Sequence, residues 1–433
     1  MKSTVNLLID EALRRPLPEL VVRDTVIRRV PGRASVLTGM RRSGKTWLCF
    51  QQMRDLIAKG TPREKMLYIN FDDERLAGFA LQDFQWLLER YFALFPSFRK
   101  ETCHFFFDEI QNVPGWERFI RRLLDTEKAE VTVTGSSAKL LSLEVASCLR
   151  GRGFATEVFP LSFREFCRFH RVEIPADGVY GAICRSRLLH AAERYLEIGG
   201  FPEIQTEPWE TARELLQDYV NTVILRDVAE RHHVANLPAL RALSRQVLQN
   251  PAAALSMTRF EGMMKQMGIP CGRNLLYAMA GHLQDAYLFF PAEIHSRSVR
   301  KRQVNPRKYY AVDTGLLNAF SLGLTQDRGA LLESMVFLAL RRRGIHPDYY
   351  RTVSGHEVDF FFSTSDKTWL AQACWSLENK ETRARERRAL DEAKKETNPT
   401  RSLIITLDEE EDTTNGIRVV PLWRWLLEME PIN

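Results

Sequence analysis

The sequence has no long run of apolar residues. A helix needs about 18 uninterrupted apolar residues to span a bilayer, and the most apolar stretch, residues 331–340, is shorter and contains Glu333. Residues 1–11 include Asp10 and Glu11 and lack the apolar core of a secretory signal. We therefore expect a cytoplasmic protein with no membrane partner.

Cysteine and histidine are too few and too scattered to build a disulfide or zinc framework. The seven cysteines are odd in number, and no pair has the CxxC spacing. The nine histidines show no spacing typical of metal ligands. Disulfide scaffolds and zinc sites depend on such spacings, so we expect reduced thiols and no structural zinc.

An excess of charge of one sign is also missing. The chain has 61 Lys and Arg against 55 Asp and Glu, a net charge of +6, and 45% of its residues are apolar. This composition is globular and excludes disordered, collagen-like and coiled-coil chains. At about 150 residues per domain, 433 residues correspond to about three domains. A nucleic-acid partner is permitted but not required.

The strongest positive feature is a phosphate-binding loop. Residues 34–38 read as an apolar strand, and a helical run starts at Trp47. Between them stands a GxxxxGKT motif made of Gly39, Met40, Arg41, Arg42, Ser43, Gly44, Lys45 and Thr46. In this context the glycines let backbone N–H groups face a phosphate, the lysine reaches the β- and γ-phosphates, and the threonine hydroxyl binds Mg²⁺. The motif predicts that ATP and Mg²⁺ are bound.

A second strand delivers two carboxylates. Residues 103–107 are apolar and end in Asp108 and Glu109. We expect Asp108 to hold Mg²⁺ together with Thr46, and Glu109 to polarise the attacking water. The alternative is an ordinary strand that ends in two solvated acids.

Two further apolar segments end in polar residues. Residues 66–71 precede an acidic cluster, and residues 131–134 precede Gly135, Ser136 and Ser137. In an open parallel sheet, the side chains just beyond the strand ends line the ligand crevice. Ser136 is therefore our candidate for sensing the γ-phosphate. Alternatively, the serines cap a helix that starts at residue 138.

Five segments, in order along the chain, resemble a prokaryotic AAA-type ATPase family whose members carry a C-terminal domain of unknown function, DUF4143. The segments are residues 108–117 (DEIQNVPGWE), 135–141 (GSSAKLL), 149–153 (LRGRG), 159–166 (FPLSFREF) and 199–203 (GGFPE). The resemblance implies an α/β fold: an ASCE/AAA+ P-loop core with a parallel sheet and a helical lid.

The resemblance also implies roles for two arginines. Arg150 and Arg152 occupy the place where related AAA+ ATPases direct an arginine at a neighbour's γ-phosphate, which suggests a homo-oligomer. In the alternative, both arginines pair with acids of their own chain. Residues 199–203 resemble a lid motif that approaches the nucleotide, or they form a helix-stopping turn.

The middle of the chain has the outline of a winged helix. Helical stretches at 240–249, 258–267 and 273–285 precede strands at 287–290 and 309–312. A basic segment between the strands contains Arg297, Arg300, Lys301, Arg302, Arg307 and Lys308. A nucleic-acid-binding wing would place these side chains on phosphates. A solvated basic face on a packing module is the alternative.

The C-terminal part has an α-β-β-β-α-β order that resembles the restriction-endonuclease fold. Its metal chemistry requires two acids and then a Glu-x-Lys on the next strand. Glu333 and Asp359 match, but Gln372 and Cys374 stand where Glu and Lys are expected. An amide binds Mg²⁺ poorly and a thiol is no ammonium. We therefore expect a nuclease relic or a weak nuclease; in the alternative, Lys367 or Lys380 substitutes for the missing lysine.

Four regions follow from these observations. They are a P-loop ATPase core (1–170), a helical lid (171–235), a winged-helix-like segment (236–312) and a nuclease-like α/β domain (313–433). We interpret the protein as a Mg²⁺-dependent ATPase that couples nucleotide state to the last two regions, with DNA as a candidate partner. Two alternatives stay open: an ATP-gated DNA nuclease, and a nucleotide-dependent interaction module with negligible turnover.

Overall fold

The computed structural model describes residues 1–135, 149, 151–321, 327–364 and 366–428. The chain divides into two compact units, Met1–Phe159 and a second unit that starts at Pro160. The second unit therefore includes the predicted lid, residues 171–235. No helix among the described residues is long and apolar enough to cross a membrane.

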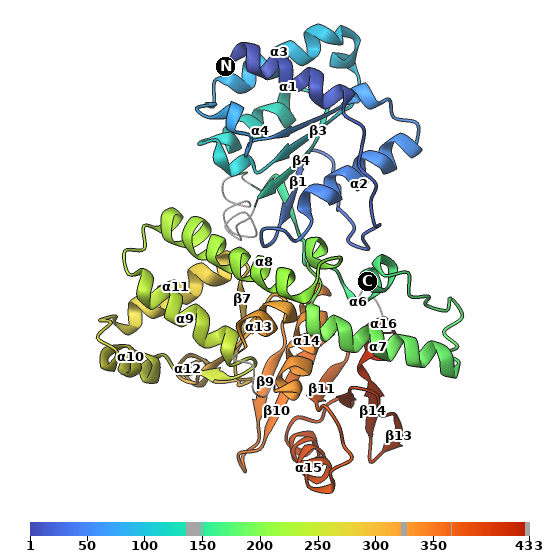
Figure 1. Cartoon of the computed structure of the whole chain (residues 1–433), viewed down its shortest axis with the longest axis vertical. Coiled ribbons are helices and arrows are strands. Elements are labelled where there is room, and N and C mark those ends of the chain that lie inside the picture. The colour runs from blue at the N-terminus through green and yellow to red at the C-terminus, as the bar shows by residue number, and fades with distance from the viewer. Residues whose placement is uncertain (136–148, 150, 322–326, 365, 429–433) are drawn as a thin grey trace. The chain divides into compact units, whose positions relative to one another are not determined.

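A five-stranded parallel sheet forms the centre of the first unit (Figure 1), with the order β2-β3-β4-β1-β5. The strands are β1 (Ala34–Thr38), β2 (Met66–Asn70), β3 (Cys103–Asp108), β4 (Ala129–Gly135) and β5 (Gly153–Glu157). The first four match the predicted apolar segments. The sequence does not predict β5, because its residues are mixed in polarity and all only partly buried. Since all pairs are parallel, the carboxyl ends of the strands meet at one edge.

Helices cover both faces of this sheet. The helices are α1 (Lys2–Arg14), α2 (Lys45–Ala58), α3 (Asp83–Leu94) and α4 (Trp116–Thr126), with short 3₁₀ turns at Arg63–Lys65, Glu74–Leu76, Pro96–Lys100 and Ile110–Asn112. One apolar cluster unites α1, α3 and α4 with the sheet, and a second one contains α2. Val36 belongs to the first and Leu37 to the second, as the alternation of side chains along a strand requires.

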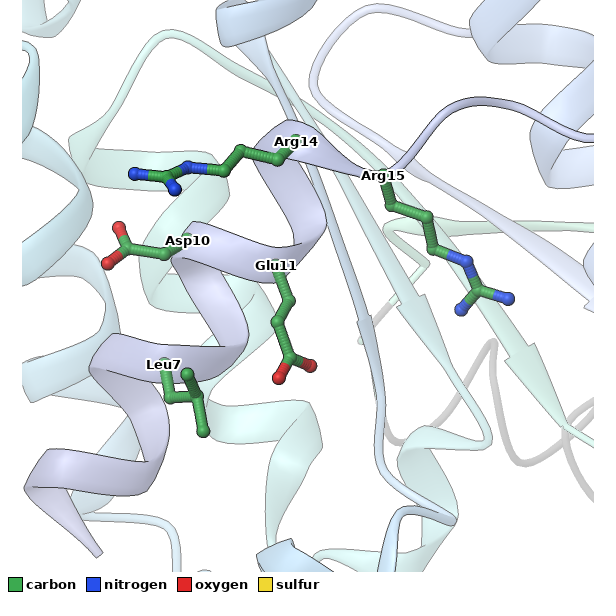
Figure 2. Close-up of a pocket in the computed structure, with 5 residues that line it drawn as sticks. All are labelled: Leu7, Asp10, Glu11, Arg14 and Arg15. Atoms are coloured by element: carbon green, nitrogen blue, oxygen red, sulfur yellow. The ribbon is translucent and has the colours of Figure 1, made fainter.

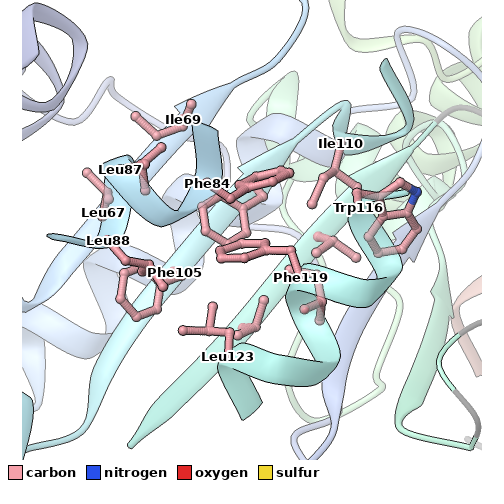
Figure 3. Close-up of a cluster of buried hydrophobic side chains, with 14 of the residues drawn as sticks. Leu67, Ile69, Phe84, Leu87, Leu88, Phe105, Ile110, Trp116, Phe119 and Leu123 are labelled. Atoms are coloured by element: carbon pink, nitrogen blue, oxygen red, sulfur yellow. The ribbon is translucent and has the colours of Figure 1, made fainter. Parts of the chain in front are cut away.

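The larger cluster is rich in phenylalanine (Figure 3). Phe84 of α3 stacks on Phe119 of α4 with ring centroids 4.0 Å apart, and Phe105 stacks on Phe107 within β3. Burying a side chain of this size contributes about 1.5–3 kcal/mol. The packing thereby holds β3, whose last residue is Asp108, in a fixed place in the sheet.

The second unit begins with helices. They are α6 (Phe163–Phe169), α7 (Ala182–Ile198), a 3₁₀ turn at Pro202–Ile204, and α8 (Trp209–Thr222), which continues as a π-helix over Val223–Glu230. Ser162 starts α6 with a capping box, because its hydroxyl accepts from the Glu165 N–H while the Glu165 carboxylate accepts from the Ser162 N–H.

The winged-helix-like segment has four helices and a small antiparallel sheet of order β6-β8-β7. Its elements are α9 (Leu237–Gln249), β6 (Ala254–Leu255), α10 (Met257–Gln266), α11 (Arg273–Asp285), β7 (Phe289–Ala292), α12 (Val299–Val304) and β8 (Arg307–Ala311). The basic segment between the two long strands contains the helix α12, which the sequence does not predict. β7 starts two residues later than predicted, because Tyr287 takes a positive φ of 61° in the turn after α11.

The C-terminal part is a six-stranded mixed sheet of order β13-β14-β12-β11-β10-β9. Its elements are α13 (Thr314–Phe320), α14 (Arg328–Arg342), β9 (Asp348–Arg351), β10 (Glu357–Ser363), β11 (Thr368–Ala373), α15 (Lys380–Thr397), β12 (Arg401–Thr406), β13 (Glu411–Thr414), β14 (Ile417–Pro421) and α16 (Leu422–Glu428). The predicted α-β-β-β-α-β order runs from α14 to β12. Helix α15 packs through Ala389, Leu390 and Ala393 on the sheet.

Candidate functional site

The phosphate loop connects β1 to α2 and has the backbone shape that its motif predicts. Arg42 and Gly44 have φ values of 67° and 100°, so the chain reverses sharply before the helix. At Gly39, where φ is 153°, a Cβ atom would lie 2.2 Å from the carbonyl oxygen of Val158. Only glycine fits there, because no side-chain carbon approaches a backbone oxygen so closely.

Lys45 lies buried at the start of α2. Its ammonium donates to the carbonyl oxygens of Gly39 (3.0 Å) and Met40 (3.1 Å), and only 5% of the residue is exposed. The lysine thus spans the mouth of the loop. The helix N-terminus beside it adds a positive potential, so the charge of this region favours an anion.

Asp108 is the centre of a network of hydroxyl groups. Its Oδ2 accepts from Thr46 Oγ1 (2.7 Å) and from the Tyr68 hydroxyl (2.7 Å), and its Oδ1 accepts from Thr134. Burial raises the pKa of Asp108, and the neighbouring charge of Glu109 raises it further. The three hydroxyl donors oppose this rise, because they stabilise the charged form.

Glu109 follows at the carboxyl end of β3 in a left-handed conformation, with φ 50°. Its backbone N–H donates to Thr134 Oγ1 (3.0 Å), so Thr134 joins the two acids. Its carboxylate lies 4.0 Å from the Lys45 ammonium through Oε1 and accepts from Gln111 through Oε2. The structure thus brings together Lys45, Asp108 and Glu109, as the sequence predicts.

The residues of the phosphate loop and Asp108 fit a nucleoside triphosphate with Mg²⁺. The hydroxyl of Thr46 and the carboxylate of Asp108 are hard oxygen ligands of the kind that Mg²⁺ prefers, and they lie 2.7 Å apart. Within the loop, the buried hydroxyl of Ser43 has no hydrogen-bond partner among the described residues. A loop with an unsatisfied donor, a buried ammonium and a helix N-terminus suits phosphate oxygens.

Sequence reasoning missed four residues of this site: Arg23, Tyr68, Gln111 and Thr134. Thr134 precedes Gly135 at the end of a predicted strand, so its place at the sheet edge was readable. Arg23 lies in an irregular segment and carries no motif. Its guanidinium donates to the carbonyl oxygens of Ser43 (3.0 Å) and Phe159 (2.7 Å). These hydrogen bonds connect the phosphate loop to the segment that follows β5.

Three further predicted residues are not tested. Ser136 and Arg150 lie outside the described residues. Arg152 forms an ion pair with Asp125 of the same chain, which is the alternative considered above. This pair is exposed, and exposed pairs contribute little energy, so it does not hold Arg152 firmly. The predicted roles of these residues stay predictions.

The C-terminal acids enclose a lysine. Lys308 Nζ lies 2.9 Å from Glu333, 2.8 Å from Glu357 and 3.6 Å from Asp359, and Tyr310 donates to Glu333 (2.7 Å). The prediction that Lys308 contacts nucleic acid is therefore wrong, because its side chain is buried and paired with carboxylates. Glu333 and Asp359 come together as the resemblance to nucleases implies.

The other two residues of the degenerate site, Gln372 and Cys374, are neutral and form hydrogen bonds within the domain. Gln372 donates to Glu386 and accepts from the Asp359 N–H (3.1 Å). Burial raises the pKa of Cys374 to about 11, so it stays a neutral thiol, which donates to the Ser376 carbonyl oxygen. The described residues contain no group of acids, histidines and cysteines arranged to hold a metal.

The basic segment divides into exposed and engaged residues. Arg297, Arg300, Lys301 and Arg302 are exposed on and beside α12. Arg307 instead pairs with Glu293 at 2.7 Å. Four of the six predicted basic side chains thus remain open to a partner.

A depression of about 490 Å³ lies on α1 (Figure 2). Leu7, Asp10, Glu11, Arg14 and Arg15 line it. Figure 2 shows that the Arg14 and Arg15 side chains extend in opposite directions, and Glu11 pairs with Arg75. The polar groups that line the depression do not converge on one point, so we do not count the depression as a functional site.

The fold and the loop geometry are those of a P-loop core of the AAA type. Family comparisons agree along the chain: residues 31–167 match an AAA domain, residues 189–328 match a domain of unknown function, DUF8612, and residues 328–425 match DUF4143. The chain is 34% identical to an uncharacterized protein of Methanocaldococcus jannaschii over 422 residues, which cover 94% of this chain and 91% of that protein. It belongs to the AAA-type ATPase family with a C-terminal DUF4143 domain.

Other similar proteins include an uncharacterized protein of Haemophilus influenzae, 28% identical over 397 residues, 91% of this chain and 94% of that protein. Among solved structures, the Walker-type ATPase of Pyrococcus abyssi is similar with 16% identity and a TM-score of 0.39, covering 74% of this chain and 95% of that one. The Orc1 protein of Aeropyrum pernix, in complex with DNA, has 17% identity and a TM-score of 0.30, covering 74% and 90%.

Proposed function

We propose that this protein binds ATP with Mg²⁺ at the phosphate loop and hydrolyses it. The observation that carries the proposal is the meeting of Lys45, Thr46, Asp108 and Glu109 at one edge of the parallel sheet. Two of these residues come from the loop and two from the end of β3, as hydrolysis of a bound triphosphate requires.

Each residue has a distinct task. Lys45 neutralises phosphate charge, and Thr46 and Asp108 hold the cation. Mg²⁺, when bound, neutralises the charge that develops on the phosphate oxygens. Glu109 orients and polarises the attacking water. Tyr68 and Thr134 keep the Asp108 carboxylate turned toward Thr46, since both donate to it.

We further propose that the nuclease-like domain has no nuclease activity. Lys308 stands among the three carboxylates that would otherwise coordinate a cation. Gln372 cannot supply the missing negative charge, and Cys374 cannot supply an ammonium. The domain then serves to receive the nucleotide state of the core. Absence of Mg²⁺- or Mn²⁺-dependent plasmid cleavage supports this, and cleavage that Asp359→Ala abolishes contradicts it.

The main proposal is tested with Lys45→Ala and Glu109→Gln. We expect Lys45→Ala to lose ATP binding, because it removes the buried ammonium that lies against the loop carbonyl oxygens of Gly39 and Met40. Glu109→Gln should bind ATP normally and release phosphate about 100-fold more slowly, since a general base contributes about 10²–10⁴-fold. Titration with a fluorescent ATP analogue and steady-state phosphate release measure the two effects.

Lys59→Ala is the matched control, because Lys59 is an exposed lysine just beyond the other end of α2. It should bind and hydrolyse ATP like the parent protein. If Lys45→Ala binds ATP with unchanged affinity, the phosphate loop is not the ATP site and the proposal is contradicted. Binding without measurable turnover in the parent protein would instead favour a nucleotide-dependent interaction module.

A second function, contact with DNA, is supported by one observation. The winged-helix-like segment exposes Arg297, Arg300, Lys301 and Arg302, and residues 297–308 contain no acid. Basic side chains of this kind bind the phosphate backbone without regard to sequence. The mostly apolar helix α11 offers few groups for reading bases, so we propose non-specific contact.

A further inference from the structure

The side chain of Gln111 holds the Glu109 carboxylate. Its amide nitrogen donates to Glu109 Oε2 at 2.5 Å, while Glu109 Oε1 faces the Lys45 ammonium at 4.0 Å. The two oxygens of the carboxylate are thus oriented by different groups. The amide determines which of them faces the phosphate loop.

The backbone after β3 makes this contact possible. Residues two apart on a regular helix do not face each other. Here Glu109 has a φ of 50°, and the 3₁₀ turn Ile110–Asn112 folds Gln111 back on it. Ile110 is fully buried and anchors the turn, so Gln111 is held beside the carboxylate.

Gln111 has no other role that the described residues reveal. Its amide oxygen is buried and accepts no hydrogen bond, and the bond to Glu109 is the one that its side chain makes within the described part of the chain. An amide that served general packing would have its oxygen satisfied as well. The orientation of the amide is therefore set by Glu109.

We propose that Gln111 is a positioning residue for the ATPase reaction: it keeps the Glu109 carboxylate directed for water activation and prevents its collapse onto Lys45. A carboxylate has only acceptor sites, and the amide takes one oxygen and leaves the other. Without the amide, the carboxylate is free to turn toward the ammonium, which neutralises both groups. This inference rests on the proposed ATPase function.

Gln111→Ala should lower kcat about 10- to 100-fold, the range expected when a catalytic group is misplaced, and leave ATP affinity unchanged. Gln85→Ala is the matched control, because Gln85 donates to Glu89 in the same type of pair on the exposed face of α3. It should change neither value. Unchanged turnover in Gln111→Ala overturns the inference.

A double-mutant cycle separates positioning from general structure. In a Glu109→Ala background, Gln111→Ala should cause no further loss of turnover, since the amide then has nothing to hold. A further loss of the same size in that background shows a structural role and overturns the inference.

A readout without nucleotide tests the contact itself. In ¹⁵N-glutamine-labelled protein, the side-chain amide signal that Gln111→Ala removes should shift in Glu109→Ala and stay in place in Gln85→Ala. A signal that does not move in Glu109→Ala overturns the inference. If Lys45→Ala retains ATP affinity, the proposed function fails, but the amide signal still reports on the contact.

Discussion

At the scale of single residues, Lys308 has the most consequential position in the second unit. It comes from β8 of the winged-helix-like segment and ends among Glu333 of α14 and Glu357 and Asp359 of β10. Burial opposes its charge, but the three carboxylates outweigh burial, so the pKa of Lys308 is raised. One ammonium thereby joins three segments that are far apart in the sequence.

The carboxylates around Lys308 respond differently to the same cation. Burial raises the pKa of Glu333 and Asp359 despite Lys308. In Glu357 burial also opposes ionisation, but Lys308 and Arg351 outweigh it and the pKa is lowered. The difference follows from exposure, because one third of the Glu357 side chain is accessible, against about one eighth for the other two.

Lys308→Met should destabilise the second unit by about 3–5 kcal/mol at pH 7.5, because it leaves buried carboxylates without their cation. The raised pKa of Lys308 means that its stabilising effect is fully present below about pH 10.4. In the variant, the carboxylates need protons in place of the cation. The deficit should therefore shrink as the pH falls from 7.5 toward 5. Urea unfolding at both pH values measures it.

Lys380→Met is the control, since Lys380 is exposed at the start of α15. Surface substitutions of this kind change stability by about 0.5 kcal/mol or less. The account of the cluster is contradicted if Lys308→Met loses no unfolding free energy at pH 7.5, or if its loss is larger at pH 5 than at pH 7.5.

At the scale of elements, a buried aspartate joins the turn after α7 to the start of α13. Asp313 accepts from the N–H groups of Gly200 (2.7 Å) and Gly315 (2.9 Å). A Cβ at Gly199, where φ is 75°, would lie 1.8 Å from Asp313 Oδ1. Burial raises the pKa of Asp313 to about 6, and both N–H donors oppose the rise. The conformation of the Gly-Gly-Phe-Pro segment is thus explained by contacts inside the second unit.

Asp313→Ala should cost about 2–4 kcal/mol of unfolding free energy, because two buried N–H groups lose their acceptor at about 1–3 kcal/mol each. Asp327→Ala is the matched control: Asp327 also caps a helix, α14, but is exposed. Its loss should cost about 1 kcal/mol. Urea unfolding of both variants gives the comparison, and equal costs would show that Asp313 acts as a helix cap alone.

Strands that are buried along their whole length could be predicted from the sequence more easily than strands that are partly exposed. The strands β1 and β3 are buried along their whole length, so their mostly apolar sequences were readable as strands. The strand β5 has no fully buried residue and gives no such signal. Helix α1 was overlooked although Val5, Leu8 and Ile9 are buried at helical spacing, a pattern that was available in the sequence.

At the scale of the whole molecule, the net charge of +6 is a poor guide to where a polyanion binds. Residues 297–308 hold six basic residues and no acid. The fold removes Arg307 and Lys308 from this set through ion pairs and leaves the others exposed on and beside α12. Any DNA-binding surface therefore rests on fewer charges than the sequence suggests.

The double substitution Arg300→Ala/Lys301→Ala should weaken DNA binding uniformly across sequences. It should also reduce the slope of log K against log[salt] by about 2, since each lost phosphate contact contributes about 0.9. The matched control is Arg14→Ala/Arg15→Ala, two exposed arginines of the first unit. Fluorescence anisotropy over a range of salt measures both, and equal slopes in the two variants would exclude α12 as the contact.

The sequence by itself determined the phosphate loop and the acidic pair that follows β3. Both are local: consecutive residues build the loop, and a buried strand ends in two carboxylates, so neighbours along the chain are neighbours in space. Only the tertiary structure decided the roles of Tyr68, Thr134 and Lys308, because their partners lie on other segments. Whether a charged side chain is exposed or neutralised by an ion pair depends on the segments that fold against it. The sequence therefore predicts Lys308 as a basic surface residue, whereas in the fold it is the buried cation of an acidic cluster.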